Sequence, residues 1–140
     1  MEKRFYYFAY GSNMHEPRML ARCPQARLVG KAVLKGFRLV ERLYADVEPK
    51  AGGAVEGVLW TVSESDLLRL DSFEGVRTGV YRRRIRRVAL GRRLCQALCY
   101  EMTPQTRRVR EGRPYPDEYR SLCSEGAVGH GVADSFTKAG

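Results

Sequence analysis

The sequence predicts a strand-dominated α+β domain, and three observations lead to this fold class. Stretches rich in aromatic and β-branched residues, such as Arg4 to Ala9 and AVEGVLWTV at residues 54–62, have the character of buried strands. Only a few segments have a capping residue at their start or a glycine at their end, as helices do, so few helices are expected. The 140 residues contain no internal repeat and no linker, so they amount to one domain with a real core.

About six strands are expected, and they mostly adjoin in sequence. This order favours a curled or barrel-like sheet, although the strand pattern alone does not establish closure. The stretch at residues 49–53 is expected to form a flexible turn and the polar stretch at 103–113 a loop. The strands are residues 4–9, 28–34, 37–40, 54–62, 81–90 and 94–102.

Three short helices are expected to flank the sheet. The first covers residues 14–23, with Asn13 as its cap and Pro17 in its first turn. The second follows Ser63, which has capping-box spacing to Asp66, and Gly75 ends it. The third begins near residues 114–116. We expect one domain over residues 1–128 and a loose C-terminal tail over residues 129–140.

The composition is that of a soluble globular protein, with 44% hydrophobic and 29% charged residues. No apolar run approaches the roughly 20 residues that cross a bilayer, so no membrane partner is expected. The first residues lack the long apolar region and small-residue cleavage site of a signal peptide. We therefore expect a cytoplasmic protein.

The cysteines and histidines do not have the spacing of a metal site. There is no CxxC pair, and His15 and His130 lie far apart. The thiols are expected to stay reduced and to act as small buried apolar residues. We predict no metal ligand set and no cofactor. The four cysteines are Cys23, Cys95, Cys99 and Cys123.

The net charge of +9 is unevenly distributed, because seven arginines fall within YRRRIRRVALGRR at residues 81–93. Such a run is able to bind phosphate backbones. However, Tyr81, Ile85 and Val88 interrupt it as in a strand with one solvated face, and no nucleic-acid-binding motif accompanies it. A solvated basic strand is therefore favoured. The alternative is a non-catalytic binding module that uses residues 81–93 on nucleic acid or another anionic partner.

The tetrapeptide Tyr10-Gly11-Ser12-Asn13 stands between the first strand and the first helix. Glycine permits a tight turn or a close backbone approach to a ligand. Backbone N–H groups before a helix favour a bound carboxylate or phosphate, and Ser12 and Asn13 add polar groups. On local grounds alone, the favoured interpretation is a turn at Gly11 with Asn13 as a helix cap.

Glu74 lies in the last turn of the second predicted helix, at the negative end of the helix dipole. A residue that violates a local preference is a candidate for function. If Phe73 and Val76 bury it, its pKa should rise towards neutrality, as suits a general acid or base. The alternative is an exposed glutamate paired with Arg77.

Taken together, these segments resemble the gamma-glutamylcyclotransferase-like family, in the right order and over most of the chain. The resemblance is carried by FAYGSNM, MLARCPQARLVGKAVLKGFRLV, AVEGVLWTVSESDLLRLDSFEGVRTGVYRR, ALCYEM and, more weakly, PDEYRSLCSEGA. It implies a small mixed β-barrel flanked by helices.

The resemblance also implies roles for individual residues. The YGSN loop would hold the glutamyl group, which assigns Tyr10, Gly11, Ser12 and Asn13, with Met14 and His15 at its edge. Glu74 would be the catalytic acid/base. Tyr100, in ALCYEM, and Tyr81 would contact substrate.

The implied activity is conversion of a gamma-glutamyl amide, from an amino acid or a related amine, to 5-oxoproline and the free amine. The substrate carries its own nucleophile, the α-amine, so no covalent enzyme nucleophile is required. A small-molecule gamma-glutamyl substrate is thus the expected partner, nucleic acid is disfavoured, and a homodimer is left open. The leaving amine is not identified by the sequence.

Overall fold

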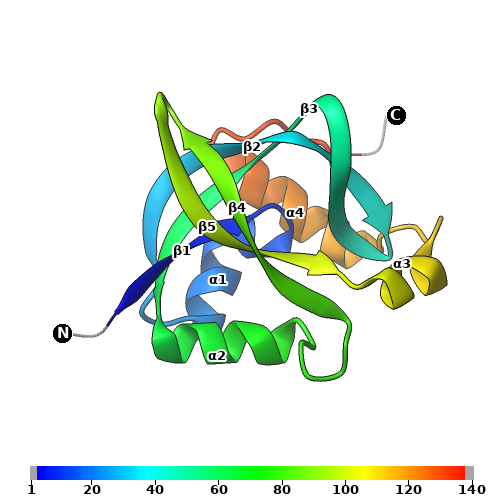
Figure 1. The fold of residues 1–140 in the computed structure, drawn as a ribbon, viewed down its shortest axis with the longest axis horizontal. Helices are drawn as coiled ribbons and strands as arrows, with labels where there is room; N and C mark the ends of the chain where they lie inside the picture. The colour runs from blue at the N-terminus through cyan, green and yellow to red at the C-terminus, as the bar shows by residue number, and fades with distance from the viewer. Residues whose placement is uncertain (1–2, 138–140) are drawn as a thin grey trace.

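The computed structural model describes residues 3–137, which contain a closed five-stranded barrel (Figure 1). The strand order around the barrel is β1-β3-β2-β4-β5. The β1–β5 pair is parallel and the other pairs are antiparallel, so the predicted mixed barrel flanked by helices is confirmed. The strands are β1 (Arg4–Ala9), β2 (Arg27–Arg42), β3 (Tyr44–Ser63), β4 (Tyr81–Leu90) and β5 (Arg93–Met102).

The described chain forms five strands where about six were expected, because two predicted strands are continuous. Residues 28–34 and 37–40 both belong to β2, whose pairing with β3 shifts register between Lys35 and Phe37. Gly36, with φ of 81°, accommodates this irregularity. The predicted flexible turn at residues 49–53 is wrong, since these residues lie within β3.

The long β2–β3 hairpin turns at Leu43, which has a φ of 65°. This left-handed conformation is uncommon for a residue other than glycine. The Leu43 N–H donates a hydrogen bond to the Arg113 carbonyl at 2.8 Å, which ties the hairpin turn to the segment after α3 (Pro104–Arg110). Tyr44 and Ala45 follow immediately, so this turn determines where β3 begins.

The first helical segment differs from the prediction in its cap. A 3₁₀ turn, η1 (Ser12–Met14), precedes α1 (Glu16–Arg22). His15, and not Asn13, caps α1, because its Nδ1 accepts the Arg18 N–H at 3.3 Å. Pro17 lies in the first turn, as expected.

The helix α2 (Glu64–Phe73) begins and ends as predicted. Ser63 and Asp66 form the reciprocal capping box. Gly75, with φ of 63°, follows the C-cap residue Glu74. Figure 1 shows α1 and α2 together on one side of the barrel.

The predicted loop at residues 103–113 is wrong over most of its length, because it contains α3. Thr103 caps this helix by accepting the Thr106 N–H, and Pro104 occupies its first turn. The last helix, α4 (Asp117–Gly129), begins slightly after the expected residues 114–116 and packs against η1.

The core fills the barrel and continues under α4. Phe8, Leu59 and Trp60 are among its largest buried side chains, and all four cysteines are buried, as expected. Beyond residue 128, the proposed domain boundary, Val132 and Phe136 are also buried. Among the described helices, none has the length and apolar character needed for a membrane crossing.

Candidate active site

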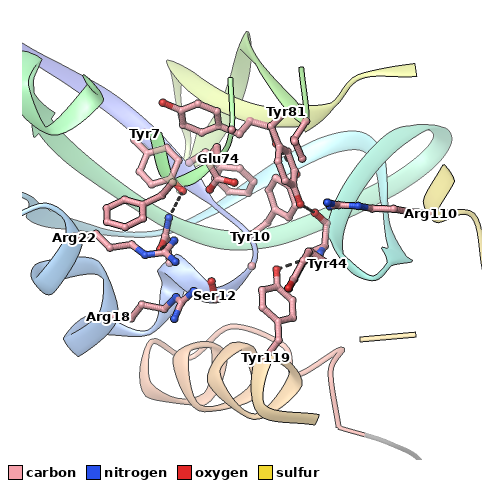
Figure 2. A pocket seen from close by; sticks show the side chains of 18 residues that line it. Tyr7, Tyr10, Ser12, Arg18, Arg22, Tyr44, Glu74, Tyr81, Arg110 and Tyr119 are labelled. Carbon is pink, nitrogen blue, oxygen red and sulfur yellow. Dashed lines mark hydrogen bonds between the residues drawn. The ribbon is translucent and has the colours of Figure 1, made fainter. Parts of the chain in front are cut away.

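A cavity of about 340 Å³ lies where β1 runs into η1, beside the end of α2 (Figure 2). Seven residues predicted from the sequence line it, and they come from four separate segments of the chain. These are Tyr10, Gly11, Ser12, Asn13, Glu74, Tyr81 and Tyr100. Its size falls within the range of small-molecule sites.

The loop Tyr10–Asn13 is held tightly in place. The Tyr10 hydroxyl donates to the Tyr100 carbonyl, which joins the loop to β5. Gly11 lies against α4, and a Cβ at this position would be 2.6 Å from the Tyr119 hydroxyl oxygen. The need for glycine is therefore steric, since any side chain would push Tyr119 away.

Asn13 bridges two walls of the cavity. Its amide nitrogen donates to the Tyr7 hydroxyl at 3.0 Å, and its amide oxygen accepts from Arg22 at 3.3 Å. Met14 and His15, predicted at the edge of the site, are not among the cavity-lining residues. Met14 is fully buried in the core, and His15 caps α1 and contacts Glu125.

The Glu74 carboxyl is the acidic group on the cavity wall. Within residues 3–137 its oxygens receive no hydrogen bond and form no ion pair, including none with Arg77. Burial raises the pKa of Glu74 to about 7, although the nearby charges of Arg22 and Arg18 act to lower it. Glu74 is therefore able to exchange a proton near neutral pH.

Two arginines of α1 extend into the same cavity, one turn apart. The Arg22 guanidinium stacks over the Phe73 ring, with its carbon 4.4 Å from the ring centroid. The Arg18 Nε is buried and has no hydrogen-bond partner among the described residues. Burial and the charge of Arg18 lower the pKa of Arg22, while Glu74 acts in the opposite direction.

The two predicted tyrosines have different hydrogen-bond partners. The Tyr81 hydroxyl donates to the Ala45 carbonyl at 2.7 Å. The Tyr100 hydroxyl donates to Asp71 at 2.7 Å, and Asp71 in turn forms a two-bond ion pair with Arg83. Burial is the main reason that the pKa of both tyrosines is raised, so both hydroxyls stay protonated.

The far wall of the cavity was not predicted. Tyr44 begins β3, Arg110 ends α3, and Tyr119 belongs to α4. Figure 2 shows Arg110 on the side opposite Arg18 and Arg22, with Glu74 and Tyr10 between them. The Arg110 guanidinium carbon lies 5.4 Å from the centroid of the Tyr44 ring.

The basic stretch at residues 81–93 lies mainly outside this site. Tyr81 alone of these residues is a cavity-lining residue in the described structure. Arg83 pairs with Asp71, and Arg86 pairs with Glu101 at 2.8 Å. Two of the arginines thus neutralise acidic side chains of α2 and β5.

The described residues contain no cluster of three or more potential metal-ligating side chains. What the cavity provides is a proton-exchanging carboxyl, cationic groups on two sides and several aromatic hydroxyls. Such a set can bind an anionic substrate and transfer a proton without a covalent enzyme nucleophile.

Comparison of the sequence with known proteins identifies relatives. A family model described as gamma-glutamyl cyclotransferase, AIG2-like, matches residues 7–121. The gamma-glutamylcyclotransferases of Mus musculus and Homo sapiens are 37% and 35% identical over 89 and 92 residues. These matches cover 55% and 57% of this chain and 47% and 49% of the relatives. The matched segments thus span about half the length of the curated relatives.

Solved structures show the same fold. An uncharacterized Homo sapiens protein aligns with a TM-score of 0.85 and 30% identity, covering 94% of this chain and 82% of its own. A structure described as gamma-glutamyl cyclotransferase aligns with a TM-score of 0.77 and 25% identity, and the alignment covers 99% of this chain and 94% of that one. The family match contains the whole barrel from Tyr7 onwards together with the Tyr10–Asn13 loop and Glu74, and on that basis this chain belongs to the gamma-glutamyl cyclotransferase, AIG2-like family.

Proposed function

We propose that this protein is a gamma-glutamyl cyclotransferase that converts a gamma-glutamyl amide to 5-oxoproline and the free amine. The observation that carries the proposal is the Glu74 carboxyl, which has a pKa of about 7 and shares a cavity with the Tyr10–Asn13 loop. Family membership and the named relatives support the same reaction class.

The reaction begins with the substrate's α-ammonium, whose ordinary pKa is about 8. Glu74 as a carboxylate takes one proton from it, which leaves a neutral amine. Because the two pKa values lie close together, this transfer is nearly balanced in free energy. Holding the substrate in a folded geometry lets the amine reach the γ-carbonyl carbon without a second reactant.

Attack of the amine forms the carbon–nitrogen bond of the five-membered lactam. The bond between the γ-carbon and the leaving nitrogen then breaks, and the leaving nitrogen takes the proton that Glu74 received. The attacking nitrogen gives up a second proton as it becomes the lactam N–H, and this proton converts the leaving amine to its ammonium form. No water is consumed, and Glu74 returns to its starting state. Backbone N–H groups of the Tyr10–Asn13 loop are our candidates for stabilising the oxyanion that forms between these steps.

The test is production of 5-oxoproline from a panel of gamma-glutamyl amino acids and gamma-glutamylamines. We expect turnover, and we expect Glu74→Gln to lower kcat by roughly 10² to 10⁴ while substrate binding persists. Glu64→Gln is the matched control, since Glu64 is exposed at the other end of α2. Full activity in Glu74→Gln would disprove the role of Glu74, and absence of 5-oxoproline across the panel would contradict the proposed function.

A further inference from the structure

We propose that Arg110 forms a second carboxylate-binding position, which selects gamma-glutamyl substrates whose leaving amine carries a carboxylate of its own. This inference rests on the proposed cyclotransferase function and identifies the substrate class within it. In this assignment the α-carboxylate of the glutamyl group would pair with Arg18 and Arg22, which line the opposite wall of the cavity.

Arg110 lacks the acidic partner that other arginines of this fold possess. Within residues 3–137 it forms no ion pair and no side-chain hydrogen bond, and its Nη1 is buried without a partner. A buried guanidinium nitrogen without an acceptor is unusual in a folded protein. By contrast, four arginines each contact a carboxylate oxygen at 2.6 to 2.9 Å, namely Arg42, Arg83, Arg86 and Arg107.

The position of Arg110 is well determined by its surroundings. One turn earlier in α3, Arg107 binds the fully buried Asp46 at 2.9 Å and the Val47 carbonyl at 3.1 Å. The guanidinium itself lies over the Tyr44 ring, where a cation–π interaction favours it. Little conformational entropy is therefore lost when a ligand binds Arg110.

The separation of the cationic groups matches the chemistry of one substrate class. In a gamma-glutamyl amino acid, the α-carboxylate of the glutamyl group and the carboxylate of the leaving amine lie on opposite sides of the scissile amide. In the cavity, Arg18 and Arg22 face Arg110 across the space beside Glu74 (Figure 2). A gamma-glutamylamine without the second carboxylate would fill the same space but leave Arg110 unpaired, which is costly for a partly buried charge.

The test compares two nearly isosteric substrates, gamma-glutamyl-L-alanine and gamma-glutamyl-L-alaninamide, which differ in the charge of the leaving group. We expect wild-type protein to prefer the acid by at least about tenfold in kcat/KM, as for a hydrogen-bonded charge pair. Arg110→Met should reduce this ratio to near one, and Arg110→Lys should retain part of it. Arg108→Met is the matched control, because Arg108 is exposed on the same helix and lies outside the cavity, so the ratio should persist.

Binding of both ligands to Glu74→Gln, with and without Arg110→Met, separates this inference from the proposed function. If no substrate is turned over but Arg110→Met still abolishes the binding preference for the acid, the function fails and the carboxylate position stands. If turnover occurs without a preference, or with a preference that survives Arg110→Met, the function stands and the inference is overturned. Binding of neither ligand would overturn both.

Discussion

The Tyr100 hydroxyl donates its hydrogen bond to Asp71 at 2.7 Å, and this direction of donation determines what Tyr100 offers to a ligand. Its one hydrogen is used outside the cavity, so the oxygen presents only lone pairs inside. Arg83 holds Asp71 in place through two hydrogen bonds of 2.7 and 2.6 Å. We therefore expect Tyr100 to accept a hydrogen bond from the α-ammonium of the substrate, with Asp71 as a positioning residue.

Tyr100→Phe should raise KM for a gamma-glutamyl substrate by about tenfold or more, because a hydrogen bond to a charged group is lost. Asp71→Asn should have a smaller effect on its own. In the double variant the two effects should not add, since Asp71 acts through the Tyr100 hydroxyl. Steady-state kinetics of the four proteins provide the measurement, and additive losses would show that Asp71 acts independently.

The dependence of kcat/KM on pH should report the titration of Glu74. The carboxylate is the form that accepts the proton, so activity should rise with pH through an inflection near 7. Arg22 lowers the pKa of Glu74, and Arg22→Gln should therefore move this inflection to higher pH. Arg92→Gln, on the exposed β4–β5 turn, should leave it unchanged. An inflection at pH 4 to 5 in the wild type would contradict the assigned base.

The raised pKa of Glu74 should also make the wild-type protein less stable as pH increases. In the unfolded chain the carboxyl ionises near its ordinary pKa of 4.5, whereas in the fold it ionises at about 7. The folded state thus holds the proton more tightly, and its stability falls between these pH values. Glu74→Gln removes this cost, so its Tm relative to wild type should increase from pH 4 to pH 8. Thermal unfolding at both pH values, with Glu64→Gln as control, is the measurement.

Gly126 brings α4 against the loop that precedes α1. A Cβ at Gly126 would lie 2.5 Å from the His15 amide nitrogen and 2.6 Å from the Met14 carbonyl carbon. Backbone atoms cannot move aside as a flexible side chain can, so Gly126→Ala should destabilise the fold by about 1 to 3 kcal/mol. Gly129→Ala, in the last turn of the same helix, meets no atom within 4 Å and should be nearly neutral. Chemical denaturation compares the two, and equal stability would refute the steric argument.

Features determined by neighbouring residues were predictable from the sequence. The capping box of Ser63 and Asp66 is a local pattern, and so is Gly75 after the end of α2. Glu74 was identified because a glutamate at that helix end opposes the helix dipole. Its burial and raised pKa agree with that reasoning.

Other local predictions failed where long-range pairing overrode residue preferences. The sequence PKAGG at residues 49–53 has turn-forming residues, yet pairing with β2 holds it in a strand. Asn13 is a good cap by type, but its amide is engaged by Tyr7 and Arg22 from other elements. The helix α3 was missed although Thr103-Pro104 is a recognisable start signal, because its arginine-rich sequence has no apolar periodicity.

The far wall of the cavity had no signal in the sequence that distinguished it. Tyr44, Arg110 and Tyr119 are widely separated along the chain and belong to three different elements. Only the barrel closure and the docking of α3 and α4 bring them to one place. The sequence alone therefore did not show which of its tyrosines and arginines line the same cavity.

The anchoring of α3 through Arg107 and Asp46 has a consequence for how this fold can diversify. The wall that carries Glu74 is built from α2 and the barrel, whereas Arg110 enters the far wall from a short helix, α3, which is secured by its own ion pair. Replacing the outer turn of α3 would change what stands at position 110 while leaving Tyr44, Tyr119 and the opposite wall in place. If Arg110 has the role proposed above, a change of leaving-group preference would require changes in one small segment alone.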